Sequence, residues 1–205
     1  MIDPSVIIAG ARSLWEAIPE DMRDWTKSEV LNFIQKRAPN FFNFCKNKLS
    51  AFWSRITNRE VKSNVDTATA NVLSLNDDIP DNVKKTIFKQ ITGSEYHPDF
   101  NVKTQGLTDI IQTDEEKKAA AMQMAYIMAV FGKINQKQEA MISEYMTSLR
   151  ITEELKKDIT NELQEAEREF AKFAEDLQRL DNEFKRTATE TQKAKKEAND
   201  IIDLI

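Results

Sequence analysis

Cysteine and histidine, the side chains best suited to nucleophilic catalysis and zinc binding, occur once each, at Cys45 and His97. The two could form a catalytic pair, but Cys45 lies in the apolar arc of a helical pattern, where a thiol stays protonated and inert. His97 precedes Pro98 in a segment without helical spacing, so we expect a loop residue. One cysteine and one histidine cannot complete a zinc ligand set. We therefore expect neither a catalytic residue nor a metal site.

The other candidates for chemistry are carboxylate clusters and phosphate-binding loops. Asp114, Glu115 and Glu116 follow Thr113 in a capping-box pattern. They belong to the first turn of a helix, where acidic side chains complement the helix dipole. The sequence contains no GxxxxGK[ST], GxGxxG, GxSxG or HExxH motif. These patterns predict a protein that is not an enzyme and uses no cofactor.

Charge and composition restrict the partners and the compartment. The formal net charge is −5 and the pI is near 5.2, which argues against nucleic acid as a partner. Residues 1–62 carry ten Lys and Arg against seven Asp and Glu, a net +3, so residues 63–205 carry −8. A single cysteine fits a reducing compartment. The longest apolar stretch, residues 119–131, spans only about 20 Å as a helix, short of the roughly 30 Å hydrocarbon core. We expect a cytoplasmic protein without a membrane span.

Helical spacing runs through nearly the whole chain, and only four glycines and five prolines interrupt it. The pattern predicts an all-α protein, a multi-helix bundle with a long C-terminal helix. Helices are expected after Thr152 and over residues 5–18, 26–38, 40–56, 58–75, 80–92, 113–131 and 135–149. The one long irregular segment is the loop 93–106. It separates an N-terminal amphipathic helical region, residues 1–92, from a helical core, 107–150, and the C-terminal helix, 151–205.

The final helix carries a heptad seam, because apolar residues from Leu163 to Phe184 recur at alternating spacings of three and four. Residues 185–200 then lack a large apolar side chain, and the chain closes with a second apolar group. Such a helix either packs back along the bundle or projects as a coiled-coil arm that binds a protein partner or forms a homo-oligomer. A frayed tail is the alternative for its end. The candidate partner-binding residues are Leu177, Leu180, Phe184, Ile201, Ile202 and Leu204.

Residues 41–56, FFNFCKNKLSAFWSRI, combine an apolar arc with several basic residues and no acidic one. Such a helix packs in a core, docks a partner protein, or lies on an anionic membrane surface with basic residues at the headgroups. Core packing is the commonest outcome for an arc of this kind, and it is our leading interpretation. The candidate membrane or partner face consists of Phe42, Lys46, Lys48, Trp53 and Arg55.

Residues 114–149, DEEKKAAAMQMAYIMAVFGKINQKQEAMISEYMTSL, resemble the core helical hairpin of the TerB-like family, which is associated with tellurite resistance and with stress or phage-defence operons. The likeness rests on the small-residue-rich helix, the turn at 130–135 and Glu139, and it extends to ITEEL at 151–155. Where the family has an aspartate before the glycine, this chain has Phe131. The resemblance therefore implies an all-helical bundle but no inherited metal site.

These patterns predict a non-enzymatic protein-interaction or scaffold module that acts through helix–helix contacts. The resemblance places it in a bacterial stress-response or phage-defence system. The alternative is a peripheral membrane-associated protein, bound to the inner membrane by the basic aromatic helix 41–56.

Overall fold

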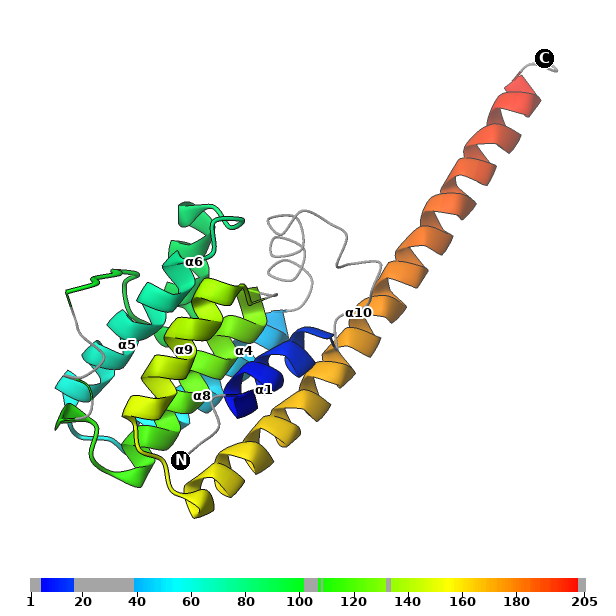
Figure 1. Cartoon of the computed structure of the whole chain (residues 1–205). Helices are drawn as coiled ribbons and strands as arrows, with labels where there is room; N and C mark the ends of the chain where they lie inside the picture. The colour runs from blue at the N-terminus through cyan, green and yellow to red at the C-terminus, as the bar shows by residue number, and fades with distance from the viewer. Residues whose placement is uncertain (1–4, 17–38, 102–106, 108, 132–133, 203–205) are drawn as a thin grey trace.

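The structure, a computed structural model, describes residues 5–16, 39–101, 107, 109–131 and 134–202. These residues form helices joined by turns and irregular segments and contain no strand, which confirms the predicted all-α class (Figure 1). The helix expected over residues 26–38 lies outside the described residues. None of the helices within the described ranges is long and apolar enough to cross a membrane.

A group of packed helices forms the body of the molecule, and one much longer helix runs along its side and beyond it (Figure 1). We call the packed group the bundle. The long helix is α10, Glu153–Ile202. The bundle helices are α1 (Ser5–Glu16), α4 (Pro39–Trp53), α5 (Arg59–Ser74), α6 (Asp81–Thr92), α8 (Asp114–Phe131) and α9 (Gln136–Ser148).

Helix α8 is the centre of the core. Every residue from Ala119 to Phe131 is buried, as the sequence predicts for an apolar stretch of this length. Helices α1, α4, α5, α6 and α10 all contact α8. Small alanines let these neighbours approach closely, and the flexible side chains of Met122, Met124 and Met128 fill the gaps that remain.

The ends of the helices follow the sequence signals. Thr113 and Glu116 form the expected capping box: the Glu116 amide donates to Thr113 Oγ1 at 3.2 Å, and the Thr113 amide donates to Glu116 Oε2 at 3.0 Å. Gly93 ends α6 with a φ of 74°, a left-handed conformation that glycine adopts without strain. Asn135 caps α9, and Thr152 Oγ1 accepts from the Leu155 amide at the start of α10.

Candidate functional site

The first third of α10 docks on the bundle. Phe170 is the last residue of α10 that is buried, among those whose side chains the structure describes. We call residues 153–170 the docking segment and residues 171–202 the arm. Figure 1 shows the arm leaving the bundle and extending away from it. The helix therefore packs along the bundle in its docking segment and projects beyond it in the arm, and a coiled coil formed by the arm stays a prediction. The buried residues of the docking segment are Leu155, Ile159, Leu163, Ala166 and Phe170.

Apolar contacts hold the docking segment in place. The ring of Phe44 in α4 packs edge-to-face against Phe170, with centroids 6.2 Å apart, and against Tyr126 of α8, with centroids 6.4 Å apart. On α1, a Cβ added to Gly10 would lie 2.8 Å from Leu163 Cδ1, closer than packed carbons approach. The absence of a side chain at Gly10 thus lets α1 and α10 cross in close contact.

Two lysines of the bundle pair with acids of the docking segment. Lys118 Nζ lies 2.7 Å from Asp158 Oδ2 and 3.2 Å from Glu162 Oε1, while Lys48 Nζ lies 3.8 Å from Glu162 and 3.6 Å from Glu165. Desolvation alone would lower the pKa of Lys118, but the hydrogen bonds and charges of Asp158 and Glu162 outweigh it and raise that pKa. These pairs add to the apolar contacts that hold α10 against α4 and α8.

A small cleft of about 170 Å³ opens beside these pairs, between α4, α8 and α10. It is smaller than the pockets of roughly 300–1,000 Å³ that bury drug-sized ligands. The Lys118 ammonium occupies part of this region, 5.7 Å from the ring centroid of Phe52. The cleft is best understood as a packing gap at the docking interface.

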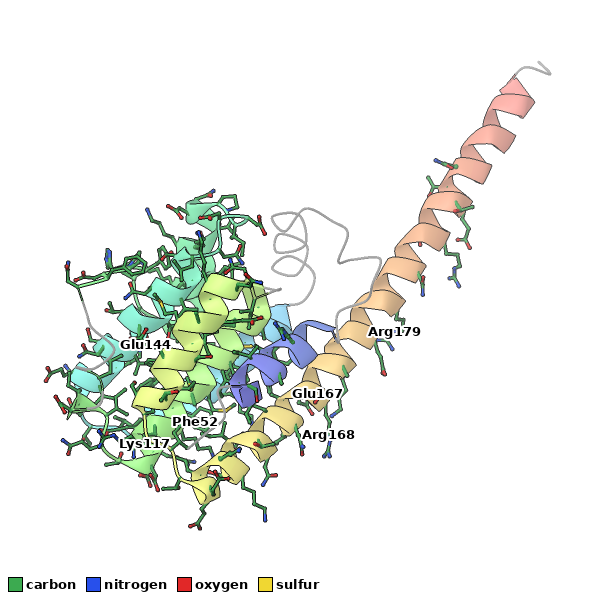
Figure 2. The ribbon with its side chains drawn as sticks, viewed as in Figure 1. Phe52, Lys117, Glu144, Glu167, Arg168 and Arg179 are labelled. Atoms are coloured by element: carbon green, nitrogen blue, oxygen red, sulfur yellow. The ribbon has the colours of Figure 1, made fainter. Side chains whose placement is uncertain are left out.

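The arm holds most of the predicted partner-binding residues, and their side chains are outside the described part of the structure. Leu177, Leu180, Phe184, Ile201 and Ile202 lie within the helical backbone of α10, and Leu204 lies beyond the described residues. The arm side chains that the structure describes are exposed, apart from the half-buried Ala171, and Figure 2 shows Arg179 extending from the ribbon. Their role in binding stays a prediction.

The residues predicted to form a membrane or partner face on helix 41–56 do not lie together on the surface. Trp53 is buried, with 8% of its surface exposed, and Cys45 and Leu49 are buried beside it. Lys46 and Arg55 are exposed, Lys48 is half-buried at α10, and the side chain of Phe42 is outside the described part. The apolar arc therefore packs in the core, which was the leading interpretation, and Trp53 is not on the surface.

Trp53 begins a chain of polar contacts that crosses the core. Its indole Nε1 donates to Gln123 Oε1 at 2.8 Å, and Gln123 Nε2 donates to Asp66 Oδ1 at 2.8 Å. Lys62 Nζ then donates to Asp66 Oδ2 and to Ser94 Oγ, both at 2.7 Å. A buried amide needs such partners, because an unpaired polar group is costly in a core. Gln123 was not among the predicted site residues, although a lone glutamine in an apolar stretch signals a buried hydrogen bond.

At its outer end the polar chain reaches a groove of about 540 Å³ between α5 and the segment after α6. Its charged lining residues are the basic Arg59 and Lys62 and the acidic Asp66 and Glu95. Lys62 is held by Asp66, and Glu95 by Lys89, whose hydrogen bond lowers the pKa of Glu95. His97, the only histidine of the sequence, is exposed here. Because Lys62, Asp66 and Glu95 are already engaged by other side chains of the protein, we assign the groove no ligand.

Cys45 lies in the core, where its thiol is not accessible to reagents in solvent. It is fully buried, and burial raises the pKa of its thiol far above the usual range. Within the described residues, no group of three or more His, Cys, Asp or Glu side chains could hold a metal ion. Glu139, which lies in the segment that resembles TerB-like domains, forms an ion pair with Arg12 of α1.

The comparisons with known proteins give this chain no relative. No protein-family model, no curated protein and no solved structure matches it. The resemblance to TerB-like domains consequently stays a prediction from residues 114–155.

Proposed function

We propose that the protein is a non-enzymatic interaction module whose arm presents a helix to a protein partner. The observation that carries the proposal is the path of α10, which continues past Phe170 and leaves the bundle (Figure 1). The bundle acts as the anchor, since aromatic packing and paired charges fix the docking segment on it. The direction in which the arm leaves the bundle is then set by the docking segment.

The length of the arm supports a role in binding. From Phe170 to Ile202 the helix advances roughly 48 Å at about 1.5 Å per residue. An isolated helix gains little stability from hydrogen bonds and propensity alone, and in proteins most of its stability comes from packing an apolar face. A long helix that leaves its own bundle would therefore gain stability from another molecule that packs on its apolar face.

The sequence of the arm supplies the surface for such packing. The heptad seam that begins in the docking segment continues without a break of register into the arm, through Phe173, Leu177, Leu180 and Phe184. Four large apolar residues at heptad spacing form the stripe that coiled-coil partners cover. The bacterial stress-response or phage-defence setting rests only on the TerB-like resemblance and remains part of the proposal.

Co-purification from the native cell tests this function. A seam variant carries Leu177→Glu, Leu180→Glu and Phe184→Glu, and a matched control gains the same three negative charges at outer heptad positions through Gln178→Glu, Asn182→Glu and Gln192→Glu. Quantitative mass spectrometry should show proteins that purify with the wild type and the control but not with the seam variant. Identical protein profiles for all three chains would overturn the proposal.

Association of α4 with an anionic membrane is the second candidate, favoured by the exposed Lys46 and Arg55. The core position of Trp53 weakens it, because the residue best suited to insert between lipids is buried. Flotation with anionic vesicles should leave the wild-type chain unbound. Binding that Lys46→Glu with Arg55→Glu abolishes would favour the membrane function over the helical arm.

A further inference from the structure

The charges of the arm are not spread evenly around its helix. Numbered so that Leu163, Phe170 and Leu177 are a positions, the register places Asp176, Glu183, Glu190 and Glu197 at g. It also places Asp181 at e, and the e and g positions border the seam on its two sides. The arm thus carries a line of acidic residues beside its apolar stripe.

The basic residues of the arm occupy the other positions. Residues 171–202 contain seven acidic and seven basic residues, so the arm has no net charge. Five of the seven acids are at e or g, whereas six of the seven basic residues are at b, c or f. Only Lys195 is a basic residue beside the seam. This separation makes the contact edge acidic although the arm as a whole is neutral.

A second copy of the chain is a poor occupant of such a seam. In a parallel pair, each g residue meets the e residue five positions on in the partner. Asp176 would then face Asp181, and the single favourable pair, Glu190 with Lys195, would at best offset that repulsion. In an antiparallel pair the g edges face each other, and these edges consist of acids.

We infer that the arm binds a helix of a different protein, amphipathic, with lysine or arginine at the positions beside its own apolar seam. The inference rests on the proposed function and names the partner chemistry for the same surface. Complementary charges at e and g select partners in coiled coils, and repulsion rejects the wrong ones. The acidic residues beside the seam therefore attract a basic partner helix and also disfavour association of the arm with a second copy of itself.

The half of the seam beyond Phe184 also restricts the size of the side chains that the partner can carry there. At a and d, Thr187, Thr191, Ala194 and Ala198 follow the large residues that end with Phe184. Small residues in a seam let the facing helix come close or accept large side chains from it. The partner helix should therefore carry its larger apolar residues opposite this half of the arm.

Two synthetic peptides of four heptads test the inference on the full-length chain. Both carry leucine at a and d; one has lysine at every e and g position, and the other has glutamate. A lysine peptide of the same composition in scrambled order reports attraction by charge alone. Binding is measured by fluorescence anisotropy of the labelled peptides, and light scattering of the chain alone measures self-association.

The expected result is a monomeric chain that binds the lysine peptide about tenfold or more tightly than the glutamate and scrambled peptides, with an advantage that falls as salt rises. The variant Asp176→Lys with Glu183→Lys should lose or reverse that preference. Its matched control, Glu175→Lys with Asp200→Lys, makes the same change of charge away from the seam and should keep it.

The other outcomes separate the inference from the proposed function. Equal binding of the lysine and glutamate peptides, or a stable dimer of the wild-type chain, would overturn the acid-edge inference while leaving an arm that binds helices. A scrambled peptide that binds as well as the ordered one would overturn the inference too. A monomer that binds none of the peptides would count against both.

Discussion

The polar chain from Trp53 to Lys62 can be tested by removing its central amide. Gln123→Met keeps nearly the same side-chain volume and a residue that favours helices, but it takes away both hydrogen bonds. Gln123 is fully buried, so the Trp53 indole N–H is left without a partner in the core. Asp66 loses one hydrogen bond but keeps Lys62 at 2.7 Å.

The size of the effect follows from these two losses. An indole N–H that is buried without an acceptor costs about 1–3 kcal/mol, and the hydrogen bond that Asp66 loses adds a fraction of that cost. We expect Gln123→Met to lower the free energy of unfolding by about 3 kcal/mol. With a urea m-value of about 2–3 kcal/mol/M for a chain of this size, the unfolding midpoint should fall by roughly 1–1.5 M.

Urea unfolding followed by far-ultraviolet circular dichroism measures this change, with Gln136→Met at an exposed position as the control. The control should stay within about 0.5 kcal/mol of the wild type. Trp53→Phe, which removes the donor, should be less harmful in the Gln123→Met background than alone, because the partner is already missing. If Gln123→Met is as stable as Gln136→Met, the polar chain does not stabilise the core and the reasoning is wrong.

Three further changes test other parts of the structure. Gly10→Val should lower the free energy of unfolding, measured by urea denaturation, by about 1–3 kcal/mol, because its Cβ meets Leu163. Ala9→Val, on the exposed side of α1, should change it little. Equal effects of the two substitutions would contradict the close crossing of α1 and α10. Burial raises the pKa of Tyr96 to about 12 and raises those of Tyr126 and Tyr145 further. The three neutral phenols therefore stabilise the folded chain fully below a pH of about 10, the pKa of an unfolded tyrosine. This stabilisation is lost as the pH rises through the pKa values of the folded chain. Phenolate absorbance should therefore rise together with the loss of helical circular dichroism, and a tyrosine that titrates near pH 10 in the folded chain would contradict this burial. Cys45 should react with a thiol reagent only after urea unfolds the chain, and rapid labelling of the folded chain would show that α4 is not packed as described.

Local signals made the helices and their ends predictable. The capping box at Thr113 and Glu116, the cap at Asn135 and the glycine that ends α6 each depend on residues within four positions of one another. The central position of residues 119–131 was also predictable, because a stretch that is apolar all round must be covered on most sides.

Contacts between distant segments were not predictable in this way. Nothing in the sequence near Lys118 indicates that its partners are Asp158 and Glu162, forty or more residues away. The heptad seam likewise shows no change at Phe170, so its spacing could not indicate where the docking segment ends and the arm begins. That point depends on how far the bundle extends, which is fixed only when all its helices are packed.

Small-angle X-ray scattering of the full-length monomer tests most directly whether the arm projects. A compact chain of 205 residues has a radius of gyration of about 17 Å. An arm of roughly 48 Å that leaves the bundle should raise this radius to about 20 Å or more and lengthen the tail of the distance distribution. A radius near 17 Å for a monomer would mean that the arm folds back on the bundle, and its surface would then not be presented to a partner.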